Sequence, residues 1–507
     1  MKNRSIFLFF LFLCAISIQA QKPIPGQTPR YCNPLPIETG QGGQAAGDVT
    51  VIRENGTYYM YCTGGGAWIS DDMLNWRFQY VENVPVAPHV VKYKNNFYMC
   101  GNDGPLFKAD NPLGPFTKSG DWKDTPGVGQ GWNGAFDVDI FIDDDGKPYL
   151  YYPGRGVSGI FVVPLDTNDL TRFAGPVKHL FGFDSNHLWE RYGEMNEYPD
   201  VAWIEGPWME KYKDTYYLQY SASGTQWKTY AEGYYTSQSP LGPFRYAPNN
   251  PLLRKTEGLV TGTAHGCIVE GPDGNLWRFY TIVLSNPPGG RRIGMDRVRF
   301  DKEGNISVNV TDVPQWAPVK GLDTENHPTT SLPLTINKFR AMNALSKVSS
   351  EQSGHYAAYA IDNSSGTWWE PAETDSLPTL TIELSPATRF DVVQLFEIDS
   401  YRLLFNRGWT RGFGRGTFTP DIYQYKLEAS MDGKTFTTVV DETGNTQSRN
   451  TIFGEIPVTP CRFVRLTITN RPRNTPLGVI EFTVFGQAKG SLPAQEPIPS
   501  FAHSDSR

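Results

Sequence analysis

The sequence predicts an all-β protein with two domains, a five-bladed β-propeller followed by a β-sandwich. Three observations lead to this prediction. A turn followed by an aromatic strand recurs five times within residues 33–319, the linker segment 320–336 is polar and contains prolines, and alternating strands of a different pattern fill residues 337–487. Because one repeat cannot bury its apolar face alone, these repeats indicate blades that pack around an axis.

The clearest copy of the repeat lies between Trp132 and Gly154. Asp137 stands before an alternating apolar run, an acidic turn follows at 143–146, and an aromatic strand begins at Tyr149. This is the pattern of a β-hairpin with an acid at its open end. The five copies are centred on Tyr59, Tyr98, Tyr149, Tyr217 and Trp277. The alternative is a generic all-β domain with chance similarities.

A second set of similar segments supports the count of blades. Each segment ends in a phenylalanine, and the set follows the first, second and fourth hairpins: residues 70–78, 109–116 and 237–244. We predict that these segments are outer strands of their blades.

Aligning the copies shows which residue stands at the Asp137 position of each one. In chain order these are Asp48, Ala87, Asp137, Glu205 and His265. The innermost strands of a propeller surround its axis, so equivalent positions meet at one end of the channel. Each residue alone could be a strand-entry acid, a turn cap or a surface charge. Together they place titratable groups among buried apolar strands, where unpaired charges are costly, and this indicates an active site.

The first twenty residues predict a secretory signal peptide, 1–20. Lys2 and Arg4 precede a short apolar run, and the small residue Ala20 stands before the expected cleavage point. A lipid anchor at Cys14 is not expected, because the bulky Leu13 precedes it. No other stretch is apolar enough to span a membrane. We therefore expect a protein that is secreted or periplasmic.

The composition of the chain limits the classes of binding partner that are expected. The chain has 507 residues, a net charge of -7 and 13% aromatic residues, so nucleic acid is not an expected partner. Aromatic side chains stack on sugar rings, which favours an oligosaccharide or polysaccharide substrate, although the same residues also fill blade cores. The five cysteines after the signal are scattered, so no disulfide framework is expected. Cys267 is expected to be a buried thiol rather than a nucleophile.

The motifs around these titratable residues resemble glycoside hydrolase family 43 and its arabinanase-like five-bladed relatives, over about residues 33–319. They are GDVTVIR at Asp48, FDVDIFIDDDGKPYLYY at Asp137, IEGPW at Glu205 and TAHGCIVEGPDGNLW at His265. Valine follows both aspartates where the family usually has proline, which indicates a subgroup. His89 stands where many relatives carry an acid, which puts substrate contacts from that blade in doubt.

The resemblance implies a role for each carboxylate. Asp48 corresponds to the general base that activates water, and Glu205 to the general acid that protonates the leaving oxygen. Asp137 corresponds to the carboxylate that orients the acid and raises its pKa. Neighbouring like charges push pKa values apart, so one carboxyl group is protonated while another is ionised. The family inverts anomeric configuration, which requires the base and the acid to lie about 6.5 to 9.5 Å apart.

The resemblance also implies substrate and calcium contacts. Arg291 aligns with an arginine that relatives place near the carboxylates, with Arg292 as the alternative. Trp132 is expected to form the base of the sugar pocket or, alternatively, to pack against other side chains of the domain. His265 corresponds to a histidine near a hydrated calcium ion on the axis, which it would contact through water. A histidine that only satisfies hydrogen bonds is the alternative. No organic cofactor is expected.

Residues 337–487 resemble discoidin-like domains of the factor V/VIII C-terminal type, which are often carbohydrate-binding modules. Alternating strands between turns predict a jelly-roll β-sandwich. The resemblance implies a structural calcium site, with ordinary turn chemistry as the alternative, at Asp362, Thr367 and Glu481. The alternative to sugar binding is a domain that only supports the propeller. Four aromatic residues are expected to form a sugar-binding platform, or three of them with the fourth in the core: Trp368, Trp369, Phe405 and Trp409. The polar tail 488–507 is expected to be disordered.

The sequence thus predicts an exported, inverting glycoside hydrolase that removes terminal or side-chain sugars from plant polysaccharides. An α-L-arabinofuranosidase is the first choice. A β-D-xylosidase, a galactosidase and a galactofuranosidase are the alternatives within the family. The alternative of another class is a non-catalytic carbohydrate-binding propeller.

Overall fold

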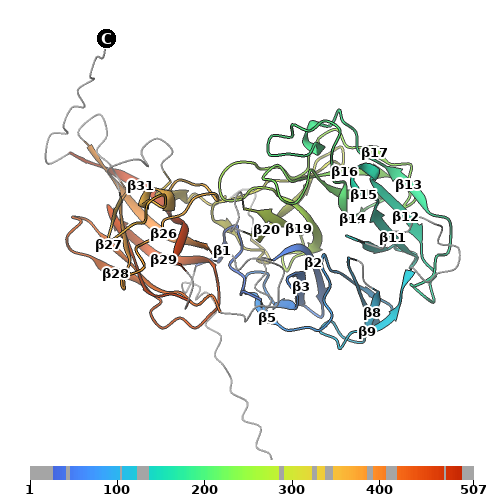
Figure 1. Cartoon of the computed structure of the whole chain (residues 1–507), viewed down its shortest axis with the longest axis horizontal. Helices are drawn as coiled ribbons and strands as arrows, with labels where there is room; N and C mark the ends of the chain where they lie inside the picture. The colour runs from blue at the N-terminus through green and yellow to red at the C-terminus, as the bar shows by residue number, and fades with distance from the viewer. Residues whose placement is uncertain are drawn as a thin grey trace, which may run out of the picture.

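The computed structural model describes residues 27–40, 46–102, 105–122, 136–284, 290–322, 328–336, 346–384, 392–406, 420–472 and 476–493. Within them the chain forms a ring of small sheets and a sandwich, at right and left in Figure 1. The predicted signal peptide 1–20, Trp132 and Trp409 lie outside the described residues. The described residues contain no helix that is long and apolar enough to cross a membrane.

Five antiparallel sheets of four strands each follow one another in the described chain. The first two are β2 (Gly47–Glu54), β3 (Thr57–Thr63), β4 (Ala67–Ser70) and β5 (Arg77–Gln79), then β6 (His89–Tyr93), β7 (Asn96–Cys100), β8 (Leu106–Ala109) and β9 (Thr117–Gly120). The third and fourth are β10 (Asp139–Ile142), β11 (Pro148–Pro153), β12 (Ile160–Pro164) and β13 (Lys178–Phe181), then β14 (Glu205–Tyr212), β15 (Thr215–Ala222), β16 (Ala231–Ser237) and β17 (Arg245–Tyr246). The fifth is β18 (Ala264–Glu270), β19 (Leu276–Val283), β20 (Arg291–Phe300) and β21 (Ile306–Val308).

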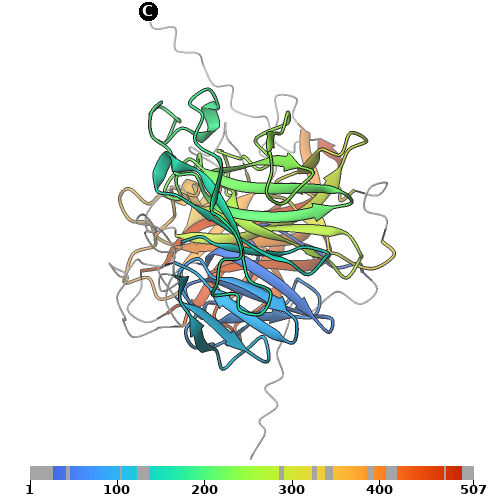
Figure 2. The same cartoon turned by 90° about the vertical axis from the view of Figure 1, so that its right-hand side faces the viewer.

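These sheets are the blades of a propeller, as predicted. The first strand of each blade packs against the first strand of the next, and β2 packs against β18, so the ring closes between the first and last blades. Figure 2 views the propeller with the second domain behind it. A short pair, β1 (Arg30–Tyr31) with β22 (Gln315–Trp316), joins the beginning and the end of the ring. Two single 3-10 turns, η2 (Gly156–Ser158) and η3 (Leu188–Glu190), lie in loops.

Each predicted hairpin joins the first and second strands of a blade. Between β2 and β3, Asn55 and Gly56 have φ values of 51° and 88°, as the tight mirror-image turn of a hairpin requires. Side chains of β3 alternate between two neighbours: Met60 shares an apolar cluster with Cys267 and Phe279 of the fifth blade, whereas Tyr61 belongs to a cluster with residues of the second blade. The period-two pattern of the sequence thus places alternate side chains on the two faces of a blade, each packed against a neighbouring blade.

The segments predicted to be outer strands are mainly turns. Residues 70–78, 109–116 and 237–244 connect the third and fourth strands of their blades, so this part of the prediction is wrong. Short polar side chains hold the turns: Asp72 Oδ1 accepts the N–H groups of Leu74 and Asn75 at 2.8 Å each. Such side chains compete with strand pairing for backbone donors, which explains why the repeated motif marks a turn.

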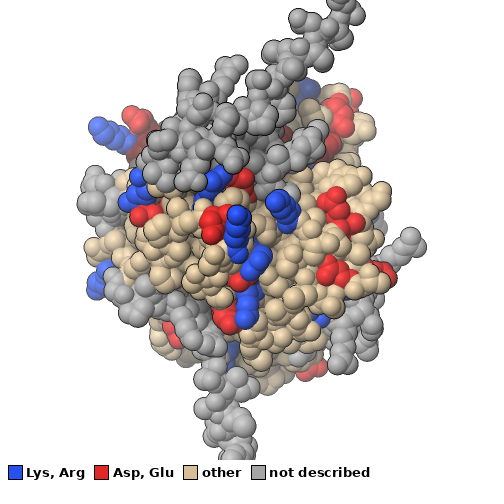
Figure 3. All heavy atoms as spheres, turned by 90° about the vertical axis from the view of Figure 1, so that its left-hand side faces the viewer, with Lys and Arg blue, Asp and Glu red and all other residues tan. Residues whose placement is uncertain are grey.

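The second domain is a β-sandwich. One sheet contains β23 (Leu332–Pro333), β31 (Gly478–Pro493), β26 (Val392–Asn406) and β29 (Thr451–Cys461). The other contains β24 (Ser346–Val348), β25 (Thr379–Glu383), β30 (Phe463–Asn470), β27 (Gln424–Ser430) and β28 (Thr437–Asp441), and the turn η4 (Ala357–Ala360) precedes β25. Side chains of both sheets form one apolar core. On the described surface of the face turned away from the propeller, acidic and basic side chains lie close together (Figure 3).

The boundaries of this domain differ from the predicted ones at both ends. β23 lies inside the predicted linker 320–336, because Leu332 pairs with Gly486. β31 continues to Pro493, past the predicted end at residue 487, because its last residues pair with the beginning of β26. The polar composition of the tail hid this strand, since strand pairing uses backbone groups that every residue carries.

The two domains share a buried interface. Arg402 of β26 is 1% exposed and donates to the carbonyl oxygens of Asn33 at 2.7 Å and Asp312 at 3.0 Å, both in the propeller part of the chain. Arg30 forms ion pairs with Glu455 at 2.5 Å and Asp399 at 3.2 Å. Leu404 and Ile480 of the sandwich belong to an apolar cluster with propeller residues. The second domain therefore contributes to the stability of the first.

Replacing Arg402 with methionine is expected to lower the stability of the whole chain. The substitution keeps an apolar stem but removes the donors, and leaving a buried carbonyl unsatisfied costs about 1 to 3 kcal/mol. Calorimetric unfolding of the full chain measures the effect. Arg471→Met is the matched control, because Arg471 is partly exposed and donates to the Glu373 carbonyl within the second domain. Equal melting temperatures for the two variants would contradict the role assigned to Arg402.

Candidate active site

Four of the five aligned residues adopt the same left-handed backbone conformation where the first strand of a blade begins. Asp48, Ala87, Asp137 and His265 have φ values of 51°, 47°, 44° and 43°. Such values are uncommon outside glycine and are costly unless the surroundings enforce them. The shared conformation shows that these four positions are structurally equivalent.

Hydrogen bonds from the preceding blade hold this conformation. The backbone N–H groups donate as follows: Ala87 to Thr63 Oγ1 at 2.8 Å, Asp137 to Asn102 Oδ1 at 2.7 Å, His265 to Ser221 Oγ at 2.9 Å and Asp48 to Thr281 Oγ1 at 2.7 Å. Each acceptor stands four residues after the central aromatic of its own repeat. Our sequence reasoning missed these acceptors, although the same alignment of repeats contains them.

The fourth blade departs from the common position by one residue. There the left-handed residue is Gly206, with φ 55°. A side chain at 206 would not fit, because its Cβ would lie 2.9 Å from Cγ and Cδ2 of His265. Glu205 therefore stands one position before the equivalent of Asp48, and the prediction that the two share one position is wrong by one residue.

Asp48 is surrounded by hydrogen-bond donors. Arg291 Nη1 lies 2.7 Å from both carboxylate oxygens, and the Thr63 hydroxyl donates to Oδ2 at 2.6 Å. His265 Nδ1 lies 3.2 Å from Oδ1. Burial opposes ionisation, but Arg291 and then His265 and Thr63 hold the pKa of the Asp48 carboxyl far below its usual range. Asp48 is therefore ionised at neutral pH.

His265 connects Asp48 to Asp137. Its Nδ1 lies 3.8 Å from Asp137 Oδ2, and the two aspartates are each 7% exposed. Burial lowers the pKa of His265, but the charges of Asp137 and Asp48 outweigh it and raise the pKa to about 9. Burial raises the pKa of Asp137, His265 opposes this, and the charge of Asp48 adds to the rise.

Glu205 is the protonated member of the group. The Tyr230 hydroxyl donates to Glu205 Oε1 at 2.8 Å. Burial, followed by the negative charge of Asp137, raises the pKa of Glu205 to about 8, although His265 and Tyr230 act in the opposite direction. One cluster thus contains an ionised and a protonated carboxyl group. Tyr230 was not predicted, since it lies outside every repeated motif of the sequence.

Arg291, rather than Arg292, is the arginine of this cluster. Arg292 points to the second domain, where its Nε donates to Thr451 Oγ1 at 3.2 Å, and its Nη1 donates to the Arg291 carbonyl at 3.0 Å. His89 lies deeper, 4% exposed, and accepts the Ile140 N–H at 3.1 Å through Nε2. The cysteines of the described chain are buried free thiols, and burial raises the pKa of Cys267 to about 12.

A directly bound calcium ion does not fit at His265. Nδ1 faces two carboxylates, and the raised pKa keeps the ring protonated, which leaves no lone pair for a cation. In the described part of the chain, no group of three or more His, Cys, Asp or Glu side chains could hold a metal ion. Contact through water remains a prediction, and no step below uses it.

In the second domain, the structure does bring the predicted calcium residues together. Asp362 Oδ2 accepts the Thr367 hydroxyl at 2.8 Å, and Glu481 Oε2 accepts the N–H of Asn363 at 3.0 Å. Burial raises the pKa values of Asp362 to about 6 and of Glu481 to about 8. Asn363 Oδ1 is buried and has no hydrogen-bond partner among the residues that the structure describes. A partly buried and a fully buried carboxylate beside an unpaired carbonyl oxygen suit a cation that prefers oxygen ligands.

The predicted aromatic platform of this domain is wrong in two of its members. Trp369 and Phe405 are each 0% exposed and belong to the sandwich core. Trp368 is partly buried, packs against a cluster that also contains propeller residues, and stacks on His355 at 4.2 Å between ring centroids. Trp369 lies outside the strands but pairs with Val479, and the end of β26 around Phe405 is buried continuously, so no alternation in the sequence marked these two as core residues.

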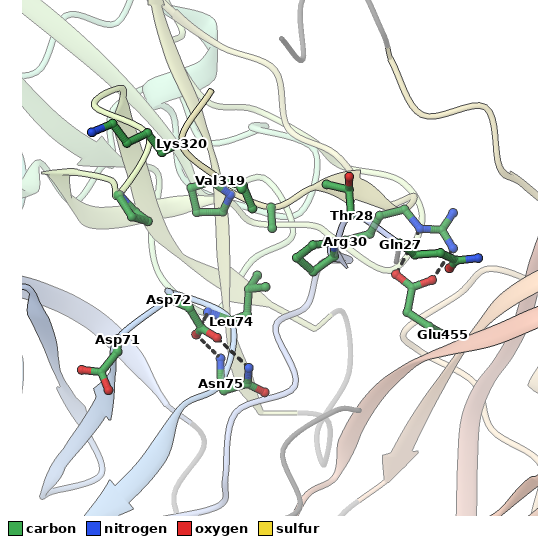
Figure 4. Close-up of a pocket in the computed structure, with 14 residues that line it drawn as sticks. Gln27, Thr28, Arg30, Asp71, Asp72, Leu74, Asn75, Val319, Lys320 and Glu455 are labelled. Atoms are coloured by element: carbon green, nitrogen blue, oxygen red, sulfur yellow. Dashed lines mark hydrogen bonds and ion pairs between the residues drawn. The ribbon is translucent and has the colours of Figure 1, made fainter. Parts of the chain in front are cut away.

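A cavity of about 310 Å³ between the two domains lies away from the cluster of Asp48, Asp137, Glu205 and His265 (Figure 4). Its lining includes Asp72, Asn75 and Pro272, which follow the far ends of β4 and β18, whereas His265 lies at the near end of β18. Figure 4 shows Asp72 bonded to Asn75, and Arg30 close to Glu455. These four polar groups therefore have partners within the chain.

The fold and the cluster together define a class of protein, the five-bladed propellers that collect acidic groups from separate blades at one end of the channel. Comparison with known families identifies the family within this class. The family model described as glycosyl hydrolases family 43 matches residues 42–306, more than half of the chain, and the chain belongs to this family.

Several curated proteins are similar to parts of the chain. It is 28% identical to a β-D-galactofuranosidase of Aspergillus niger over 181 residues, which are 35% of this chain and 46% of that protein. It is 28% identical to xylosidase/arabinosidase 43A of Humicola insolens over 242 residues, 41% of this chain and 66% of that protein. The chain thus spans about half to two thirds of these relatives. A crystal structure of a thermostable family-43 glycoside hydrolase is 27% identical, with a TM-score of 0.48, and covers 57% of this chain and 100% of that one.

Proposed function

We propose that the protein is an exported glycoside hydrolase that cleaves O-glycosyl bonds with inversion. The observation that carries this proposal is the opposite protonation of two carboxyl groups in one cluster, Asp48 ionised and Glu205 with a pKa of about 8. Glycoside hydrolysis requires this pair, a base for water and an acid for the leaving oxygen. Membership of glycosyl hydrolases family 43 supports the same chemistry.

In this mechanism, Asp48 takes a proton from water while Glu205 gives its proton to the glycosidic oxygen. Arg291 and Thr63 hold the Asp48 carboxylate in one orientation. Asp137 keeps Glu205 protonated through its negative charge, and Tyr230 fixes Glu205 Oε1 so that the proton resides on Oε2. Water attacks from the side opposite to the leaving group, which inverts the anomeric carbon.

For the substrate, we propose a terminal or side-chain sugar of a plant polysaccharide, with an α-L-arabinofuranoside as the first candidate. The names of relatives support this range, since they include a β-D-galactofuranosidase, a xylosidase/arabinosidase and an α-L-arabinofuranosidase. Initial rates on nitrophenyl α-L-arabinofuranoside, β-D-xyloside, β-D-galactoside and β-D-galactofuranoside test the proposal. One sugar should be cleaved well above the others. Failure to cleave these glycosides and the corresponding polysaccharides would favour a carbohydrate-binding propeller.

Replacing Asp137 with asparagine is expected to shift the basic limb of the pH profile of kcat/KM to lower pH. Activity needs protonated Glu205, so it falls as pH rises through the Glu205 pKa of about 8. Removing the negative charge of Asp137 lowers that pKa, and we expect a shift of about one unit with a lower maximal rate. An unchanged limb, together with a lower melting temperature, would instead assign Asp137 a structural role.

The second domain is proposed to be a discoidin-like module with a structural calcium ion held by Asp362, Thr367 and Glu481. Calcium would offset the cost of removing these two carboxylates from water, so adding Ca²⁺ should raise the melting temperature and a chelator should reverse the rise. Asp362→Asn should abolish this dependence, whereas Asp441→Asn, at an exposed acid of the same domain, should retain it. A wild-type melting temperature that changes with neither Ca²⁺ nor chelator would contradict the proposed calcium site.

A further inference from the structure

The segment between the third and fourth blades exposes several large apolar side chains. Five residues between the start of η3 and the start of β14 are involved, with exposed fractions of 62% for Leu188, 76% for Met195, 49% for Tyr198, 45% for Val201 and 39% for Trp203. We call these five residues the apolar rim. Large apolar side chains gathered on a surface mark a binding site more often than they mark ordinary surface.

Buried polar contacts hold the rim in position. Glu190 is 1% exposed and accepts hydrogen bonds from the Tyr220 hydroxyl at 2.5 Å and from His187 Nδ1 at 2.7 Å. Asn196 Nδ2 donates to the Arg191 carbonyl at 2.6 Å. A surface that is already ordered loses little entropy when it binds a ligand, so the rim is suited to binding.

The rim leads directly to Glu205. Along the extended chain, Val201 and Trp203 are exposed while the residues between and after them are buried. Side chains of an extended chain alternate, so Val201, Trp203 and Glu205 lie on one side. The Trp203 N–H donates to the Ser223 carbonyl at 3.3 Å, just past the end of β15. The aromatic surface thus adjoins the carboxyl group that carries the proton.

We propose that the apolar rim binds the leaving part of the substrate and that this part is a neutral polysaccharide chain. The inference rests on the proposed function, because a general acid protonates the leaving oxygen. The leaving part must therefore lie on the side of Glu205, and the released sugar on the side of Asp48 and Arg291. Sugar rings present apolar faces that stack on aromatic side chains such as Trp203.

The charges around the rim select against anionic chains. Glu197 and Asp200 are exposed within the same segment, and Glu194 pairs with Lys228 at 3.8 Å. The neighbouring arginines donate to protein oxygens, Arg191 to the Ser185 carbonyl at 2.7 Å and Arg254 to Asn196 Oδ1 at 3.3 Å. Acidic groups around a binding surface repel a ligand of the same sign. A neutral xylan, arabinan or galactan fits this surface, whereas a polyuronate does not.

Binding by an inactive variant tests the proposal. Full-length Glu205→Gln is run in affinity electrophoresis against soluble arabinoxylan, arabinan, galactan and polygalacturonate. We expect retardation by one or more of the neutral polymers and none by polygalacturonate. Adding Trp203→Ala should weaken the affinity about tenfold, as the loss of one stacking contact implies. Adding Tyr356→Ala, which removes a 44% exposed tyrosine of the second domain, should leave it unchanged.

The possible results distinguish a failure of the rim proposal from a failure of the proposed catalytic function. Equal retardation with and without Trp203→Ala, no retardation by any neutral polymer, or stronger retardation by polygalacturonate overturns the rim proposal. Tyr198→Ala gives a second test of the same surface if Trp203→Ala is insoluble. Wild-type rates of hydrolysis of the neutral polymers by Glu205→Gln would overturn the proposed function instead, whatever the binding result.

Discussion

Glu205→Gln is expected to lower kcat by about three orders of magnitude on a glycoside whose leaving group is a sugar or an alcohol. Glutamine keeps the size and the contact with Tyr230 but has no proton to give, and acid catalysis contributes about 10²- to 10⁴-fold. A nitrophenolate leaves without protonation, so the loss on nitrophenyl glycosides should be much smaller. Steady-state rates on both substrate types measure this difference, which is the signature of a general acid.

Asp145→Asn is the matched control for this substitution. Asp145 is an exposed acid of the turn between β10 and β11, at the opposite ends of these strands from Asp137. This variant should retain the wild-type rates on both substrates. A loss by Glu205→Gln that is equal for good and poor leaving groups would remove Glu205 from the role of acid.

Asp48→Asn is expected to lower kcat by about 10²- to 10⁴-fold on every substrate alike. The base activates water whatever the leaving group is, so the nature of that group should not change the loss. The substitution also leaves the Arg291 guanidinium without its charged partner. Rates on an activated and an unactivated glycoside, with circular dichroism to verify folding, check this result. A loss confined to poor leaving groups would contradict the assignment of Asp48 as the base.

The acid limb of the pH profile offers an independent check of Asp48. Its carboxyl has a pKa far below the usual range, so it stays ionised, and the base stays active, well into acid. The limb on the acid side should therefore lie below pH about 4, the ordinary value for an aspartate. A limb near pH 6 would show that another group acts as the base.

Much of the propeller and of its site was predictable because both repeat. The aromatic second strands located every blade, and their alignment found Asp48, Asp137 and His265 at equivalent backbone positions. Repetition works as a signal because each blade solves the same packing problem with the same pattern. The roles assigned to these residues remain predictions.

The remaining features depend on contacts between segments that no repeat relates. Tyr230 bonds to Glu205 from a loop without a counterpart in other blades, and Gly206 shifts the fourth blade by one residue to make room for His265. The interface through Arg402 joins residues far apart in the chain. The local sequence pattern carries no information about such contacts. For the same reason, the pattern did not predict the last residues of β31, which pair with the beginning of β26.

The anomer that is released first tests the central claim most directly. Proton NMR of the wild-type reaction, recorded before the free sugar equilibrates, should show the configuration opposite to that of the substrate, and Asp48→Asn should produce neither anomer at a comparable rate. Inversion requires a water molecule between the general base and the anomeric carbon. In the proposed mechanism Asp48 is this base, and Glu205 protonates the leaving oxygen. A first product with retained configuration would contradict the account, because one of the carboxylates would then be a nucleophile.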